Sequence, residues 1–380
     1  MQINSKLPNV GTTIFTTMSA LAKEHNAINL SQGFPDFNCS PKLTELAGKY
    51  INTGFNQYAP MPGTIQLRER VAEMIALCYE AVYHPDSEIT ITAGATQGIF
   101  TAVSAFIGAG DEVIVFEPAY DCYVPAIELQ GAKVVYCQLN PLDFSINWQE
   151  VRSKISDKTK MIMINSPHNP SGAVITAHDL AELEKTVSGK NIIVLSDEVY
   201  EHMVFDGQQH QSVARNKTLR EQSVIISSFG KTVHTTGWKI GYVAAPDLLM
   251  KEFRKVHQFL VFAVNHPLQL ALADFLVDKK NYLDLKDFYE KKRDLFLKLT
   301  KSSRLLPLKT SGTYFQLMSC KNISDESDTE LAIRLTKEKK LASVPLSVFY
   351  NQKTDNSLLR FCFAKKDETL ERAAEIICGL

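Results

Sequence analysis

A lysine in a short polar segment is the residue of this chain best placed for covalent chemistry. Lys231 follows a β-branched run at 223–226 that reads as a buried strand, and it lies among small residues that predict a tight loop. A buried lysine loses its charge readily and can act as an amine nucleophile. Lys239 follows on the same segment and can hold a phosphate. This pairing fits an enzyme that binds pyridoxal phosphate (PLP), and the competing interpretation is a basic surface loop.

Two further predicted strands end in residues that suit an anion and a planar ring. After the strand at 88–92, Ala95 and Thr96 open a helix, and the free N–H groups of a helix start favour negative charge. After the strand at 112–116, Tyr120 can stack on a ring. The competing interpretations are an ordinary strand-to-helix turn and a core tyrosine.

Two more strand ends carry an amide and a carboxylate. Asn169 follows the strand at 160–165 in a proline-rich turn, where its amide can donate to a phenolate oxygen. Asp197 ends the apolar strand at 191–197, and a buried carboxylate is costly unless it has a partner such as a protonated pyridine nitrogen. Tyr200 is close enough to reach the same ring. A rigid capped turn and a salt bridge are the competing interpretations.

The remaining candidates lie far apart in the sequence. Tyr58 brings an aromatic hydroxyl on the loop at 56–63. Arg360 lies in the apolar strand at 358–363, where an arginine needs an anion and its planar fork suits a carboxylate. A structural ion pair and an edge-strand arginine are the alternatives.

The elements that carry these residues predict an α/β fold. Strands alternate with helices such as 97–107 and 177–187, which favours a mostly parallel sheet with ligands beyond the carboxyl ends of its strands. The other predicted strands of this sheet are 133–138, 224–228 and 241–245. The chain from 247 to 300 reads as helical, with interruptions at Pro267 and Lys279. Strands at 312–317 and 358–363 and a helix from Asp367 predict a smaller α+β domain.

We expect three parts along the chain. Residues 1–39 form an N-terminal arm and part of the small domain, residues 40–276 the large PLP-binding domain, and residues 277–380 the C-terminal small domain. A chain of 380 residues is long enough for two such domains.

Composition sets limits on the partners. The net charge of −1 and the pI near 6.8 give no broad electrostatic reason to expect nucleic acid or an anionic membrane surface. The seven cysteines are scattered without a CxxC, which fits a reducing cytoplasm. No paired-histidine motif indicates a metal, and no signal-peptide core or membrane-length apolar run is present. We therefore expect a cytoplasmic protein with no metal, nucleic acid or membrane partner.

The ordered set of strand-end residues resembles a known family. Together with the segments 30–37 and 256–259 and the tyrosine loop, it is similar to the fold-type I PLP enzymes. Within them it resembles the class I aminotransferases of the methionine, aromatic amino acid and kynurenine branch. The likeness runs from about Gly11 to the C-terminus. It implies the fold-type I transferase fold, PLP as cofactor and a homodimer.

The resemblance also implies a role for each residue. Lys231 anchors the cofactor covalently and then carries the proton, Asp197 keeps the pyridine nitrogen protonated, and Tyr200 and Asn169 bind the ring oxygen. Tyr120 stacks on the ring. The phosphate is held by Ala95, Thr96, Ser228 and Lys239, with Tyr58 reaching in from the partner subunit. The substrate carboxylate is held by Arg360, with the Gly33 backbone and the Asn169 amide.

The activity implied is transfer of the amino group of a large neutral L-amino acid, methionine or an aromatic one, to a 2-oxo acid by a ping-pong mechanism. The alternative is a kynurenine–oxoglutarate transaminase or a cysteine-S-conjugate β-lyase on the same scaffold. Ala263 stands after Phe262 where kynurenine-type members often have histidine, which argues against kynurenine as main substrate. The ligand-sensing domain of a transcription regulator would need a basic helix-turn-helix extension, and an NAD enzyme a GxGxxG. Neither pattern is found in the sequence.

Overall fold

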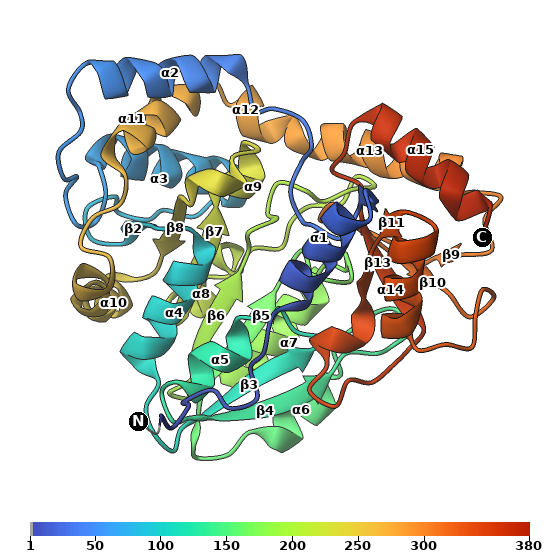
Figure 1. Cartoon of the computed structure of the whole chain (residues 1–380). Helices are drawn as coiled ribbons and strands as arrows, with labels where there is room; N and C mark the ends of the chain where they lie inside the picture. The colour runs from blue at the N-terminus through green and yellow to red at the C-terminus, as the bar shows by residue number, and fades with distance from the viewer. Residues whose placement is uncertain (1–2) are drawn as a thin grey trace.

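The computed structural model describes residues 3–380, and its centre is a seven-stranded sheet (Figure 1). Met1 and Gln2, which begin the predicted N-terminal arm, lie outside the described residues. The spatial order of the strands is β2-β8-β7-β6-β5-β3-β4. Only β8 runs against its neighbours, so the prediction of a mostly parallel α/β sheet is confirmed. The strands are β2 (Ile89–Thr92), β3 (Glu112–Glu117), β4 (Lys133–Gln138), β5 (Thr159–Asn165), β6 (Ile193–Asp197), β7 (Ser223–Ser228) and β8 (Gly241–Ala244).

Helices cover both faces of this sheet, because successive strand side chains point to opposite sides. Val113 and Val115 pack under one helical layer, whereas Ile114 packs under the other. Burying each such side chain contributes about 1.5–3 kcal/mol. The first layer contains α4 (Ala95–Phe106), α5 (Tyr123–Glu128) and α10 (Asp247–Leu260). The second contains α3 (Ile65–Tyr79), α6 (Trp148–Lys154), α7 (Ala177–Val187) and α11 (His266–Phe275), and α2 (Pro41–Asn52) packs on α11.

The C-terminal part forms a separate antiparallel sheet with the order β12-β13-β10-β9. The N-terminal segment lies beside it, because β1 pairs in parallel with β11 and α1 packs on α14 (Figure 1). The strands are β1 (Ile28–Asn29), β9 (Leu306–Pro307), β10 (Phe315–Ser319), β11 (Leu341–Ala342), β12 (Val344–Pro345) and β13 (Leu358–Cys362). The helices are α1 (Ile14–Glu24), α13 (Leu285–Leu299), α14 (Asp328–Glu338) and α15 (Asp367–Cys378).

Short helical turns complete the described chain. They are α8 (Lys217–Arg220), α9 (Phe229–Thr232), α12 (Lys280–Leu283), η1 (Val213–Arg215), η2 (Thr236–Trp238) and η3 (Leu346–Phe349). No helix within residues 3–380 is both long and apolar enough to cross a membrane. The predicted domain boundaries at residues 40 and 277 stay predictions.

Three local predictions were wrong. The strand expected at 312–317 begins only at Phe315, because the Gly312 and Thr313 N–H groups donate to loop carbonyls instead of a neighbouring strand. Pro267 does not interrupt a helix: it lies in the first turn of α11, where a missing N–H is no loss, and the break falls before it. Lys231 lies on the helical turn α9 and not in a loop.

Candidate active site

The carboxyl ends of the central strands meet at a cavity of about 300 Å³. The small C-terminal sheet and the N-terminal segment close its other side, because residues of both line it. Every predicted site residue except Tyr58 is in the lining. These residues are Gly33, Ala95, Thr96, Tyr120, Asn169, Asp197, Tyr200, Ser228, Lys231, Lys239 and Arg360.

Lys231 is held at the centre of this cavity by two oxygen atoms. Its Nζ donates to the Gly33 carbonyl at 3.0 Å and to the Tyr314 hydroxyl at 2.9 Å. Burial lowers the pKa of Lys231 to about 8, and the nearby cations Lys239 and Arg360 act in the same direction. About a tenth of the amine is therefore neutral at pH 7, far more than for an exposed lysine, and the neutral form is the one that nucleophilic attack requires.

Asp197 is a buried carboxylate with acceptor capacity to spare. It lies at the end of β6 and is 3% exposed. The Tyr123 hydroxyl donates to it at 2.5 Å, and the Val199 N–H donates to it at 3.3 Å. Burial raises the pKa of Asp197 to about 6, although these two hydrogen bonds act to lower it. Among the described residues no lysine, arginine or histidine forms a salt bridge with it, so its charge calls for a cation in the cavity.

Arg360 is also buried without a carboxylate partner among the described residues. Its Nη1 donates to Asn169 Oδ1 at 2.6 Å and its Nη2 to the Ser31 carbonyl at 3.2 Å. Its Nε is buried with no hydrogen-bond partner within residues 3–380. The guanidinium lies 3.9 Å from the ring centre of Phe315, and burial lowers the pKa of Arg360. A free cationic donor in an aromatic setting suits a carboxylate.

The start of α4 forms the anion end of the cavity. Gly94 precedes it with φ 82°, and a Cβ atom there would lie 3.2 Å from the Lys239 Nζ. The lysine amine therefore sits directly against the glycine backbone, beside the free N–H groups of Ala95 and Thr96. Helix start, cation and the neighbouring Ser228 together make a site for a phosphate.

Tyr58 stands apart from this cavity. Its side chain is 80% exposed, and its ring contacts Phe262 edge-on with 5.0 Å between ring centres. Within one chain, the structure does not bring Tyr58 together with the other predicted site residues.

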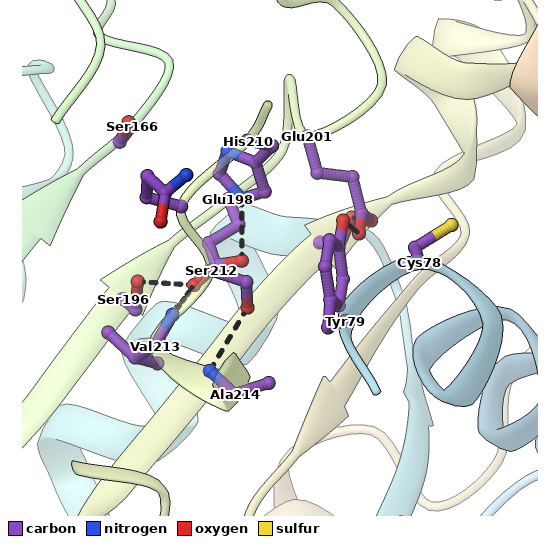
Figure 2. A network of polar contacts seen from close by, with 12 residues as sticks. Cys78, Tyr79, Ser166, Ser196, Glu198, Glu201, His210, Ser212, Val213 and Ala214 are labelled. Atoms are coloured by element: carbon purple, nitrogen blue, oxygen red, sulfur yellow. Dashed lines mark hydrogen bonds and ion pairs between the residues drawn. The ribbon is translucent and has the colours of Figure 1, made fainter. Parts of the chain in front are cut away.

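Behind the cavity lies a polar network that sequence reasoning did not assign (Figure 2). Glu198 accepts hydrogen bonds from the Ser196 hydroxyl at 2.7 Å and the Val213 N–H at 3.1 Å, and its carboxylate lies 2.8 Å from His210. Glu201 accepts from three hydroxyls, those of Tyr79, Ser227 and Tyr242. Both glutamates lie next to predicted site residues, yet neither lines the cavity.

Sequence reasoning also missed residues that hold the predicted ones. Asn165 ends β5, and its side chain joins two loops: it donates to the Asp197 carbonyl at 2.9 Å and accepts from the Asn169 N–H at 2.8 Å. Tyr123 and Tyr314 provide the hydroxyls beside Asp197 and Lys231. A polar residue at the end of an apolar strand was the available signal for Asn165, whereas Tyr314 gave none.

Comparison with known proteins agrees with this geometry. The family described as aminotransferase class I and II matches residues 25–377. The chain belongs to this family. The methionine aminotransferase of Escherichia coli (strain K12) is 49% identical over 372 residues, covering 98% of this chain and 96% of that protein. The kynurenine–oxoglutarate transaminase of Dictyostelium discoideum is 32% identical over 410 residues, covering 97% and 94%.

A solved structure has the same fold. The crystal structure of YbdL from Escherichia coli, for which a methionine aminotransferase function was identified, superposes with a TM-score of 0.98 at 48% identity, covering 100% of both chains. This aminotransferase therefore has the predicted fold-type I architecture. It uses PLP as cofactor and takes an amino acid and a 2-oxo acid as substrates.

The residues of this aminotransferase fit that cofactor. A phosphate is matched by the Gly94 and Lys239 cradle, a ring cation by the Asp197 carboxylate, and a carbonyl carbon by the Lys231 amine. When bound, PLP supplies an electron sink that stabilises negative charge at the substrate Cα.

Proposed function

We propose that the amino donor is a large neutral L-amino acid, methionine or an aromatic one, and that a 2-oxo acid takes the amino group in the second half of a ping-pong cycle. The charges of the cavity carry this proposal. Among the described lining residues the cations are Lys231, Lys239 and Arg360, and each is matched above to the cofactor or to the substrate carboxylate. No cation among the described lining residues is left to pair with an acidic side chain of the substrate. The aromatic rings of Phe15, Phe34 and Phe315 line the same cavity and suit an apolar one.

The contacts support a proposed role for each residue on the cofactor side. Lys231 forms the covalent anchor and then carries the proton between the substrate Cα and the cofactor. Asp197 holds the proton of the ring nitrogen, which its spare acceptor capacity and raised pKa support. Tyr120 stacks on the ring, and Tyr200 binds the ring oxygen. Because Asn169 Oδ1 is engaged by Arg360, the Nδ2 of Asn169 remains to donate to that oxygen.

On the other side of the cavity the proposed roles concern anions. Arg360 grips the substrate carboxylate, with Gly33 backbone and the Asn169 amide beside it. Ala95, Thr96, Ser228 and Lys239 bind the phosphate.

A half-reaction screen tests the substrate proposal. The purified enzyme, yellow with PLP, is mixed with single amino acids, and the loss of cofactor absorbance is recorded for each. We expect methionine and the aromatic amino acids to react fastest. Aspartate and glutamate should be slower by roughly 10²-fold or more, because burying an unpaired carboxylate costs several kcal/mol. Equal rates for aspartate and methionine would contradict the proposal.

We also propose a homodimer in which Tyr58 reaches the phosphate of the partner subunit. Tyr58 and Phe262 are both exposed aromatic residues in contact with each other, and Phe259 nearby in sequence is 88% exposed. Such exposed apolar side chains are typical of a contact surface. Mixing Tyr58→Phe chains with Lys231→Ala chains tests this. If Tyr58 acts in trans, each heterodimer has one intact site and activity recovers; heterodimers without recovery would place Tyr58 in its own subunit's site.

The second candidate is a kynurenine–oxoglutarate transaminase or a cysteine-S-conjugate β-lyase on the same scaffold, and the 32% identical relative supports the first of these two activities. A product assay separates the reactions: transamination yields the 2-oxo acid of the donor, whereas β-elimination from a cysteine conjugate yields pyruvate and a thiol. A cytoplasmic location is proposed with either activity, supported by seven cysteines that form no disulfide.

A further inference from the structure

Tyr314 binds the reactive lysine through its hydroxyl. It lies just before β10 and is fully buried. Its oxygen accepts a hydrogen bond from the Lys231 Nζ at 2.9 Å, and its own proton is donated to the Gly33 carbonyl. The same carbonyl accepts a second bond from Lys231 at 3.0 Å. Amine, phenol and carbonyl therefore form a closed triangle of contacts.

The proton state of this triangle is fixed by burial. Burial raises the pKa of Tyr314 well above its usual value, so the phenol keeps its proton at neutral pH. Since that proton points to Gly33, only an oxygen lone pair faces Lys231. Tyr314 is thus an acceptor for the lysine and not a base that removes its proton.

Two opposing sets of groups act on the lysine charge. Burial, Lys239 and Arg360 disfavour the ammonium, whereas acceptor oxygens favour it because hydrogen bonds to the charged form stabilise that form. The titratable and charged side chains around Lys231 are Asp197, Tyr200, Lys239, Tyr314, Arg360 and Cys362. Of these, Tyr314 is the side chain with a hydrogen bond to the amine.

We propose that Tyr314 is a positioning residue for proton transfer: its phenol oxygen binds the Lys231 ammonium whenever this nitrogen is not bonded to the cofactor. This inference rests on the proposed role of Lys231 as proton carrier. Tyr314 holds the ammonium in place and increases the fraction that carries a proton to give. With an amino donor, Lys231 takes a proton from the substrate Cα and gives it to the cofactor carbon, and with a 2-oxo acid the same proton moves in the opposite direction. Tyr314 and Gly33 exchange no proton.

Removing only the phenol oxygen of Tyr314 tests whether this residue acts through its hydroxyl or through the packing of its ring. The Tyr314 ring packs against Tyr200, Tyr289 and Phe315, with ring centres 5.1, 5.5 and 4.9 Å away. Tyr314→Phe keeps these ring contacts and removes the acceptor. Tyr289→Phe is the matched control, because Tyr289 is equally buried and its hydroxyl has no hydrogen-bond partner within residues 3–380.

The enzyme carrying pyridoxamine phosphate is the form to measure, because its Lys231 amine is free. It is prepared by incubating the holoenzyme with an amino donor and removing the 2-oxo acid. The rate of Lys231 acetylation by acetic anhydride is then followed by peptide mass spectrometry across neutral and alkaline pH. The wild type, Tyr314→Phe and Tyr289→Phe are compared, with thermal melting curves showing that each is folded.

Tyr314→Phe should shift the midpoint of this profile down by roughly one to two pH units, the effect of losing one hydrogen bond to a charged group. Tyr289→Phe should superpose on the wild type. No shift, an upward shift, or the same shift in both variants would overturn the inference.

A second measurement applies if acetic anhydride does not reach Lys231. In single turnovers of the same enzyme form with a 2-oxo acid, Lys231 must first accept a proton, so the acidic limb of the pH–rate profile reports formation of its neutral amine. That limb should move to lower pH in Tyr314→Phe alone, and an unmoved limb would overturn the inference. An inactive Lys231→Ala together with an unshifted Tyr314→Phe would refute only the role of Tyr314, whereas an active Lys231→Ala would refute the proposed function itself.

Discussion

Asp197 and Glu201 are buried carboxylates of the same short segment, yet their surroundings are opposite. Glu201 accepts hydrogen bonds from hydroxyls on α3, β7 and β8, and Asp197 accepts one hydroxyl and one backbone N–H. Burial acts to raise both pKa values. In Glu201, His202 and the three hydroxyls outweigh burial and the pKa falls below its usual value, whereas the pKa of Asp197 rises to about 6.

This difference in hydrogen-bond partners distinguishes a carboxylate of the structural framework, Glu201, from a carboxylate of the active site, Asp197. The Glu201 carboxylate is satisfied by the chain's own donors, so its charge joins three elements of the fold. Figure 2 shows Tyr79 beside Glu201. The cavity side keeps unused capacity: Asp197 has no cation partner among the described residues, Arg360 has an unpaired Nε, and Lys231 has a lowered pKa. Perturbed and unsatisfied groups in a cavity mark the place where a ligand completes the interactions.

Removing Lys231 should have the largest effect on the cavity side. Lys231→Ala loses both the covalent anchor and the proton carrier, and proton transfer alone accounts for roughly 10²–10⁴-fold in rate. We expect loss of nearly all turnover, measured in steady state and in single half-reactions. Lys365→Ala is the control, since Lys365 is a buried lysine that donates to the Phe34 carbonyl at 2.7 Å. Only the Lys231 variant should lose cofactor attachment that is trapped by borohydride reduction.

Asp197→Asn should lower activity severely with little loss of folded protein. A neutral amide cannot hold the proton on a ring nitrogen, and breaking a buried charge pair costs roughly 2–5 kcal/mol. The measurement is kcat/KM together with bound PLP and the melting temperature. A fully active Asp197→Asn enzyme would show that this carboxylate belongs to the framework with Glu201.

Arg360→Ala should reduce kcat/KM by on the order of 10²–10³-fold for every amino acid. Lysine should rescue poorly, because it offers a point charge without the planar fork. Amines without a carboxylate should be poor substrates of the wild type and should lose little further rate in the variant. If amines and amino acids lose the same factor, Arg360 supports the fold instead of the substrate.

Glu201→Gln should give the smallest effect on catalysis and a distinct effect on stability. Replacing charge-assisted hydrogen bonds by neutral ones costs about 1–3 kcal/mol of unfolding free energy, measured by denaturant titration. Tyr79→Phe removes one of the three donors and should cost less. A Glu201→Gln enzyme that is as stable as the wild type but inactive would show that Glu201 acts in catalysis and not in stabilising the fold.

The two carboxylates should also differ in the pH dependence of stability. The lowered pKa of Glu201 stabilises the fold above its usual value of 4.5, and this contribution is lost as the pH falls through the folded-state pKa. The deficit of Glu201→Gln should therefore shrink in acid. The raised pKa of Asp197 has the opposite sign: in enzyme stripped of cofactor, Asp197→Asn should gain stability relative to wild type as pH rises from 3.8 to about 6.

Much of the fold and of the cavity was predictable from local pattern. Apolar runs ending in single polar residues defined the strands, and parallel strands place their carboxyl ends at one edge. For that reason Asp197, Asn169 and Lys231 could be grouped before any coordinates. Boundaries such as the start of β10 were less predictable, because loop carbonyls compete for its N–H groups.

Sequence alone determined which residue types stand at the strand ends, and with them the chemistry that this chain can perform. It did not determine that the carboxylate of Asp197 keeps spare acceptor capacity whereas that of Glu201 is satisfied by three hydroxyls. The donors that decide it come from distant segments, such as Tyr79 on α3 and Tyr242 on β8. The acceptor that holds Lys231 likewise comes from Tyr314 in the C-terminal part. Burial and hydrogen-bond partners set the charge of each group, and both exist only once these segments pack together.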